Sequence, residues 1–163
     1  MKKDVTIRIT GNQYRERNEN FPGSSEDIRE SDVVIQEFSG TYYDKDGMNY
    51  ILYEEINEDD PETVKVTLKY DGTSMEITKR GLLNSRMVFK RGESFKSDYV
   101  TPFGTFTLGI FTKKYTVSSS TITPLPGTEE SFPEAINLHA VYDMEINDEF
   151  ASENEISVDI VFI

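Results

Sequence analysis

Apolar and polar residues alternate along most of this chain. The alternation is clear over residues 5–10 and returns at 64–70, 138–146 and 156–162. Successive side chains of a β-strand point to opposite faces of a sheet, so a period of two predicts strands with one buried and one exposed face. No segment shows the apolar stripe of an amphipathic helix of ordinary length. The pattern therefore predicts an all-β protein.

Turn signals separate these segments. Asp71-Gly72 accepts the positive φ angles of a tight hairpin turn, and Thr101-Pro102-Phe103-Gly104 has Pro and Gly where a type I turn favours them. Further tight turns are predicted at 44–47, 90–93 and 147–149, and a bulge or corner at 80–83. The predicted strands are 3–14, 31–43, 48–56, 62–70, 73–79, 84–91, 94–101, 104–117, 136–147 and 152–162.

The connections are short, so strands adjacent in sequence should pair antiparallel. An open sheet of this size would leave two long edges prone to aggregation, and closing the sheet removes them. Both terminal strands have an apolar face and could pair with each other. We predict one domain over residues 1–163, an antiparallel closed β-barrel of about 8–10 strands. A two-sheet sandwich is the alternative, and loop insertions are expected at 15–30 and 118–134.

The excess of acidic over basic residues limits the kinds of partner that the protein can bind. The chain carries 30 acidic and 17 basic residues, a formal net charge of −13, which repels nucleic acid phosphates and anionic lipid. It has no Cys and no apolar run long enough to span a membrane, and Lys2-Lys3 is followed by alternation rather than by the apolar core of a signal peptide. We expect a cytoplasmic protein that binds neither nucleic acid nor membrane.

The sequence contains no convincing catalytic or metal-binding motif. His139 is the single histidine, too few for a typical zinc site in a chain without Cys. It is either a lone acid–base or ligand group or an ordinary histidine, and the second interpretation is favoured because no nucleophile motif accompanies it. The run 44–47 resembles the start of a calcium loop but lacks the remaining ligands, so a turn is favoured. We predict no catalytic residue, no metal site and no cofactor.

One carboxylate stands out on a predicted strand. Glu54 is in phase with Leu52 and Ile56, which indicates a charge on an apolar face, where burial without a partner is costly. Arg86 is the candidate partner. The pair would be either a structural ion pair at a barrel end or a clamp for a ligand.

Four short motifs resemble the YwiB-like family of bacterial proteins, and together they cover most of the chain from Val33 onward. They are Gly40-Thr41-Tyr42-Tyr43, Leu52-Tyr53-Glu54-Glu55, Met87-Val88-Phe89-Lys90-Arg91-Gly92-Glu93 and Tyr99-Val100-Thr101-Pro102-Phe103-Gly104. The resemblance implies a calycin-like (lipocalin-like) β-barrel. The family has no established activity, and the segments 15–30 and 118–134 are longer here than its pattern.

Three functions fit such a barrel. The first is a non-catalytic binding module that holds a small hydrophobic or amphipathic ligand in its interior, because a barrel of this size is either filled by side chains or holds one small ligand. The residues expected at this site are Tyr53, Glu54, Arg86, Tyr99 and Tyr142. The second is a solid barrel that acts as a structural protein or contacts a basic protein partner. The third is an enzyme working in the lumen. The sequence does not indicate an oligomeric state.

Overall fold

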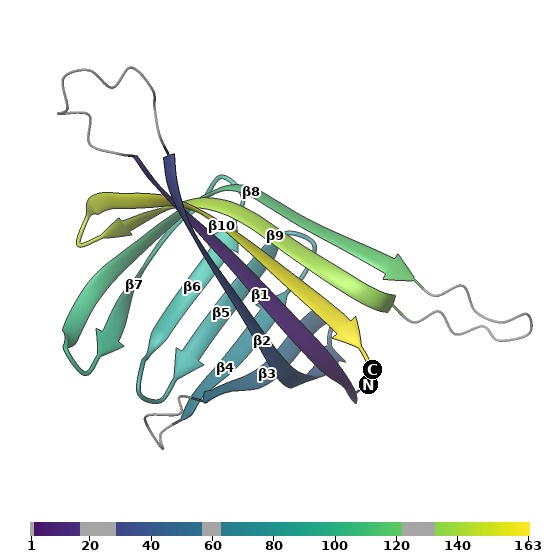
Figure 1. Ribbon diagram of the computed structural model, residues 1–163. Helices are drawn as coiled ribbons and strands as arrows, with labels where there is room; N and C mark the ends of the chain where they lie inside the picture. The colour runs from purple at the N-terminus through teal and green to yellow at the C-terminus, as the bar shows by residue number, and fades with distance from the viewer. Residues whose placement is uncertain (1, 17–28, 57–62, 122–132) are drawn as a thin grey trace, which may run out of the picture.

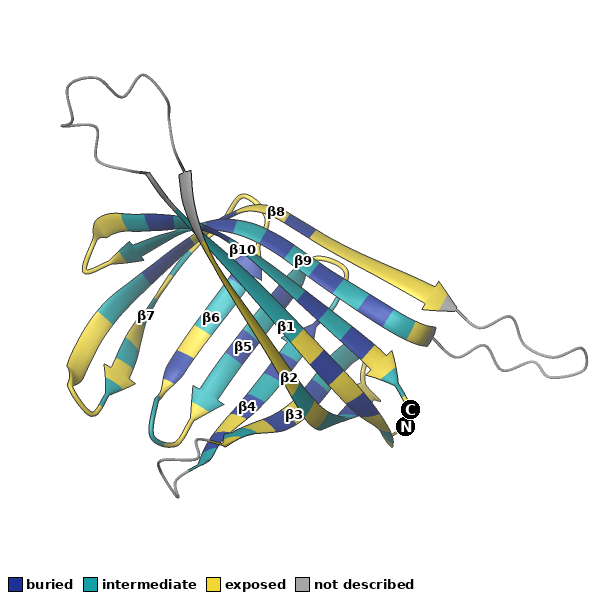
Figure 2. Ribbon diagram, viewed as in Figure 1, coloured by how far each residue is buried: buried dark blue, intermediate teal, exposed yellow. Residues whose placement is uncertain are grey.

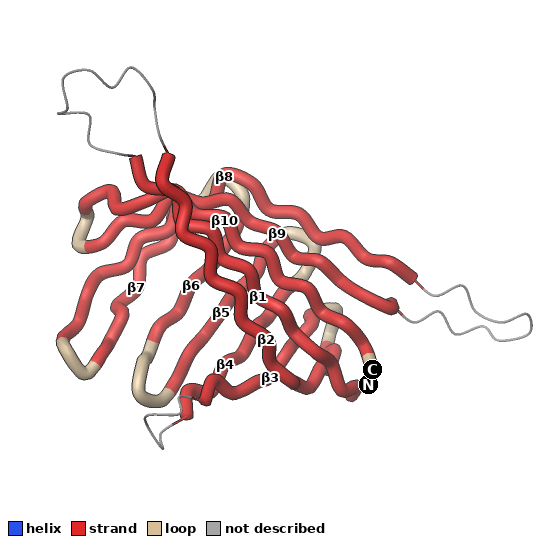
Figure 3. The backbone as a smooth tube through the Cα atoms, viewed as in Figure 1, coloured by secondary structure: helices blue, strands red, loops and turns tan. Residues whose placement is uncertain are grey.

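The computed structural model describes residues 2–16, 29–56, 63–121 and 133–163, and these residues are almost entirely strand (Figure 3). The ten strands are β1 (Lys2–Glu16), β2 (Arg29–Lys45), β3 (Met48–Ile56), β4 (Thr63–Tyr70), β5 (Ser74–Arg80), β6 (Ser85–Lys90), β7 (Ser94–Thr101), β8 (Gly104–Thr121), β9 (Pro133–Ile146) and β10 (Glu149–Phe162). The all-β prediction is confirmed, with strand ends shifted by a few residues. None of the described segments forms a helix that could cross a membrane.

The strands form one antiparallel sheet in the order β6-β5-β4-β3-β2-β1-β10-β9-β8-β7. β1 pairs with β10 from Val5↔Phe162 to Tyr14↔Glu153, so the terminal strands do pair, and the two chain ends lie side by side (Figure 1). The sheet curls until β6 approaches β7, which gives a nearly closed barrel. The predicted barrel architecture is confirmed.

The seam of the barrel lies between β6 and β7, although these strands are neighbours in sequence. Among the described residues, one isolated bridge crosses the seam, in which Asn84, just before β6, and Val100 of β7 exchange backbone hydrogen bonds of 3.0 and 2.9 Å. The connecting turn pairs with β8 instead, because the Gly92 N–H donates to the Thr112 carbonyl at 2.8 Å. The tight turn predicted at 90–93 is present, but no full ladder joins the two strands that it connects.

Alternate side chains face a common interior, seen as the alternating colours of Figure 2. On β4, Val64, Val66 and Leu68 all point inward and are at most 6% exposed, as the alternation predicts. Burial of this apolar face is the main favourable contribution to folding. The remaining apolar residues of the buried core are Val5, Ile7, Tyr42, Ile51, Tyr53, Tyr70, Met75, Ile77, Phe89, Ile110, Tyr115, Ile136, Leu138, Ala140, Tyr142, Val158 and Ile160.

Two hairpins extend beyond the barrel wall, β1–β2 and β8–β9 (Figure 1). The predicted loops at 15–30 and 118–134 are too long at both ends, since residues 15–16, 29–30, 118–121 and 133–134 are strand. Serines 118–120 pair with residues 135–137 of β9, because a backbone ladder continues wherever a partner strand is in reach, whatever the side chain. The rest of both predicted loops lies outside the described residues.

β2 parts from β3 halfway along its length. It pairs with β1 from Arg29 to Tyr43 but with β3 only from Gly40 to Lys45. At Gly40 the strands lie so close that an added Cβ would come within 2.7 Å of the Leu52 carbonyl oxygen. Before Gly40, over residues 31–39, β2 and β3 are not paired and the wall of the barrel is open.

Candidate functional site

A largely apolar cavity of about 410 Å³ lies at the barrel end where β5, β7 and β9 finish and β6 and β8 begin. This volume falls in the range of small-molecule sites in proteins. We call it the mouth cavity; its lining residues are Lys79, Ser85, Met87, Tyr99, Phe106, Leu108, Met144 and Ile146. Two of them are methionines, whose flexible thioethers adapt to ligands of varied shape. The cavity can thus accept an apolar group.

One ion pair marks the polar side of the mouth cavity. The Lys79 ammonium lies 2.9 Å from a Glu55 carboxylate oxygen, and both side chains are mostly buried. Glu55 occupies an inward position of β3, in phase with Ile51 and Tyr53. A charge pair beside an apolar cavity is the arrangement that orients the polar end of an amphipathic molecule.

The opposite end of the barrel, which we call the closed end, is packed with the buried rings of Tyr42, Tyr70 and Tyr115 and the partly buried ring of Phe162. The Tyr115 hydroxyl donates to the carbonyls of Asp71 and Ser74, at 2.9 and 3.1 Å. The Tyr42 hydroxyl donates to Asn49 Oδ1 at 2.6 Å, and the Tyr42 ring packs edge-on against Phe162. The two ends therefore differ: one is packed by hydrogen-bonded aromatics and the other holds a cavity.

Burial also perturbs the interior phenols. It raises the pKa of Tyr53, Tyr70 and Tyr115 well above the ordinary tyrosine value, with smaller contributions from nearby Glu55, Tyr42 and Asp71. It raises the pKa of Tyr142 to about 12. The Tyr53 and Tyr70 hydroxyls are buried and have no hydrogen-bond partner among the described residues. These phenols are neutral, and the hydroxyls of Tyr53 and Tyr70 are unsatisfied polar groups inside the barrel.

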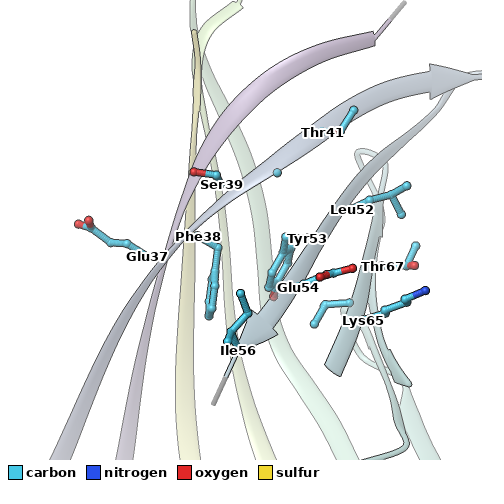
Figure 4. Close-up of a pocket in the computed structure, with 12 residues that line it drawn as sticks. Glu37, Phe38, Ser39, Thr41, Leu52, Tyr53, Glu54, Ile56, Lys65 and Thr67 are labelled. Carbon is cyan, nitrogen blue, oxygen red and sulfur yellow. The ribbon is translucent and has the colours of Figure 1, made fainter. Parts of the chain in front are cut away.

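A second, more open hollow of about 810 Å³ lies in the wall where β2 parts from β3, and we call it the side cleft. Phe38 of β2 stacks on Tyr53 of β3, with ring centroids 4.8 Å apart. These rings and Ile56 converge on the space between the two strands (Figure 4). Glu54 and Lys65, paired opposite each other on β3 and β4, line its outer side.

The predicted site residues do not form one site. Tyr99 lines the mouth cavity and Tyr53 the side cleft. Tyr142 lies inside the barrel with its ring edge-on to Phe89, at 4.8 Å. The predicted Glu54–Arg86 pair is wrong. Glu54 is exposed on the outer face of β3, and the Arg86 guanidinium donates to Glu76 at 2.6 Å.

Glu54 was wrongly placed on an inward face because the residues in phase with it on the strand are apolar. Leu52 and Ile56 are apolar, yet both are exposed and face outward, so the apolar set chosen on β3 was the outer one. Arg86 instead bridges the seam: it binds Glu76 of β5 and lies over the Phe95 ring of β7, 5.1 Å from its centroid. Its contacts are those of a residue that holds the barrel together.

His139 has a partner that the sequence did not reveal. Its Nε2 lies 2.6 Å from Glu155 Oε1, and the Tyr14 hydroxyl donates to the other oxygen of Glu155 at 3.3 Å. His139 and Glu155 alternate with the buried residues of β9 and β10 and so lie on the outer wall. None of the three lines the mouth cavity or the side cleft, so the ordinary interpretation of His139 still stands. Within the described part of the chain, no group of three His, Asp or Glu side chains could hold a metal ion.

Sequence reasoning missed Lys79, Glu55, Met87 and Met144. Glu55 and Lys79 are separated by 24 residues and meet because β3, β4 and β5 are consecutive strands of the sheet. The sequence placed the two methionines on predicted strands but gave no sign that they line a cavity. Glu55 is in phase with Ile51 and Tyr53, which would have indicated its inward position. The phase of Glu54 with the apolar residues Leu52 and Ile56 led instead to the choice of Glu54.

Comparison with known proteins supports the fold. The crystal structure of the ywiB protein from Bacillus subtilis matches this chain with a TM-score of 0.72 and 18% sequence identity, covering 99% of this chain and 93% of the other. At that identity the match establishes the shared fold, and it confirms the resemblance to YwiB-like proteins. No curated protein matches the chain in sequence. A family model, described as a domain of unknown function (DUF1934), matches residues 20–158, so the chain belongs to the DUF1934 family.

Proposed function

We propose that this protein is a non-catalytic binding module, a calycin-like barrel that holds a small amphipathic molecule in the mouth cavity. The observation that carries the proposal is the apolar cavity of about 410 Å³ at one end of a barrel whose other end is filled. An apolar group would lie against Met87, Leu108 and Met144, where it leaves water. A polar end would meet the Lys79–Glu55 pair at the edge of the cavity.

The rim of the cavity suits this role. Phe106 and Ile146 line the cavity and remain partly exposed, and Phe103 protrudes from the turn that joins β7 to β8. Exposed apolar residues grouped around a hollow are typical of ligand sites rather than of scattered surface positions. An enzyme is a weaker proposal, because the described lining of this cavity includes no His, Asp or Glu, and its one ammonium group, on Lys79, is bound by Glu55.

The test is to fill the cavity. Anilinonaphthalene sulfonate, an aromatic anion that fluoresces in apolar sites, should bind the wild-type protein. We expect Leu108→Trp to weaken this binding at least tenfold, because the indole would occupy the space. Val161→Trp, on the outer wall of β10, is the matched control and should bind normally. Met144→Phe is a milder second variant should Leu108→Trp fail to fold.

Native mass spectrometry of freshly purified protein gives an independent readout. A co-purified small molecule present in the wild type and Val161→Trp, but absent from Leu108→Trp, supports the proposal. Equal fluorescence in all variants would show that the probe binds elsewhere and would overturn it.

A further inference from the structure

The strand edge bordering the side cleft has no partner among the described residues. Between residues 31 and 39, β2 pairs with β1 alone, and β3 joins it only from Gly40 onward. Backbone N–H and C=O groups on an unpaired edge can hydrogen-bond to another chain. We call residues 31–39 the β2 edge.

The β2 edge is also unusually apolar. Val33, Val34 and Ile35 are 55%, 58% and 61% exposed. Neighbouring residues on a strand point to opposite faces, so this run presents apolar side chains on both faces at once. Proteins commonly protect free edges with charge, proline or bulges. The three residues of this run have none of these, although Asp32 and Glu37 lie on either side of it. Such an edge is suited to strand addition from a partner.

The side cleft supplies pockets for the side chains of an added strand. Its floor is the stacked pair Phe38 and Tyr53, its wall includes Ile56, and its volume is about 810 Å³. Ile56 is 74% exposed, so a docked side chain would cover it. Backbone pairing along β2 and an apolar or aromatic anchor in the cleft are the two components of peptide recognition by strand addition.

Electrostatics favours a basic segment of another protein over a second copy of this chain as the strand that pairs with the β2 edge. A second copy of this chain would add another molecule of net charge −13 and bring two copies of Asp32 to one short interface. Like charges across neighbouring strands are destabilising. Glu37 is bound by Arg8 at 2.8 Å and Glu54 lies opposite Lys65, so the exposed carboxylate of Asp32 is the charge that a segment added beside the apolar run would meet. A cationic segment meets this carboxylate, and the net negative charge of the chain, favourably.

We propose that the β2 edge and the side cleft bind an extended, basic segment of another protein, which adds to the sheet beside β2. The segment would alternate apolar and cationic residues, with one bulky side chain entering the cleft between Phe38 and Ile56. This site is separate from the mouth cavity and does not depend on a ligand being bound there.

The probe is a fluorescein-labelled peptide, acetyl-Lys-Val-Lys-Val-Thr-Phe-Lys-Val-amide, with binding followed by fluorescence anisotropy. Three control peptides separate the contributions. One carries Glu in place of Lys. The other two are N-methylated at alternate residues, each along a different edge of the extended peptide, which removes the backbone donors of that edge but keeps every charge. We expect the Glu peptide, and the peptide N-methylated on the edge that faces β2, to bind at least tenfold more weakly. If both N-methylated peptides bind like the parent, the contact is charge adsorption alone and strand addition is wrong.

Protein variants locate the contact. Val33→Ser with Ile35→Ser changes only exposed side chains and should weaken binding at least fivefold, while Val161→Ser, on a strand paired at both sides, should not. Hydrogen exchange should show new protection at residues 31–39 when peptide is bound. Absence of that protection would overturn the proposal. So would a concentration-dependent dimer in sedimentation that the double variant abolishes, since the occupant would then be a second copy.

Discussion

The closed end and the mouth of this barrel are built from the same ten strands but finished differently. At the closed end, aromatic rings fill the interior, and the hydroxyls of Tyr42 and Tyr115 donate to Asn49 and to backbone carbonyls. At the mouth, flexible methionines and partly exposed apolar residues surround a cavity of about 410 Å³. The difference separates a packed end from an end with a cavity, and we expect the closed end to contribute more to stability than the mouth.

The largest expected effect is on the closed end at alkaline pH. Burial raises the pKa of Tyr70 and Tyr115 in the folded protein, so their protonated forms stabilise the fold fully below the unfolded pKa of about 10. That stabilisation is lost as the pH rises above about 10 toward the folded pKa. Thermal unfolding followed by circular dichroism between neutral and strongly alkaline pH should show a steep loss of stability.

Tyr70→Phe is the control for this effect. The Tyr70 hydroxyl has no hydrogen-bond partner among the described residues, so its removal should change the melting temperature little at neutral pH. Above pH 10 the variant should be more stable than the wild type, because one buried phenol no longer ionises. Identical alkaline curves for the two proteins would mean that other groups, such as lysines, cause the loss.

A matched pair of phenylalanines measures the packing difference directly. Phe89 is fully buried, and Phe89→Ala should lower the free energy of unfolding by about 3–5 kcal/mol. Phe106 at the mouth is 38% exposed, and Phe106→Ala should lower it by less than about 1.5 kcal/mol. Urea unfolding provides both values. Equal losses would show that the mouth is as tightly packed as the interior.

A glycine pair tests where the closed wall gives way to the side cleft. In Gly40→Ala the new Cβ would clash with the Leu52 carbonyl and with the Ile7 side chain, at 2.7 and 2.9 Å, so about 1–3 kcal/mol of stability should be lost. An added Cβ at Gly11 meets no atom within 4 Å, and Gly11→Ala should change stability by less than about 1 kcal/mol. Thermal denaturation of both variants decides whether the β2–β3 contact is as tight as described.

The smallest effect concerns single hydroxyl groups at the two ends. Tyr115→Phe removes the hydrogen bonds to the Asp71 and Ser74 carbonyls and should lower stability by about 1 kcal/mol. Tyr99→Phe at the mouth should change it by no more than about 0.5 kcal/mol. If the two substitutions have the same effect, the hydrogen bonds of Tyr115 do not contribute to the closed end.

The sequence by itself determined the strands, the positions of most turns and the inward face of most strands. The conformation predicted at Asp71-Gly72 is wrong, because neither residue has a positive φ, which occurs instead at Asp46-Gly47 and Asn147-Asp148. Alternation is a local property, since each side chain's face follows from its position along its own strand. For this reason Val64, Val66 and Leu68 were placed correctly, and so was the corner near 80–83, where Gly81 adopts a φ of 134°. The phase failed at β3, where exposed Leu52 and Ile56 resemble a buried face.

The tertiary structure alone decided the seam, the site and the partners of the charged residues. Arg86 binds Glu76 rather than Glu54, and Lys79 meets Glu55, because the order and register of strands set which distant residues become neighbours. The mouth cavity and the β2 edge likewise arise where the curvature of the sheet separates strands that local pattern would pair. Curvature depends on the packing of the whole barrel, and no segment of the sequence encodes it alone.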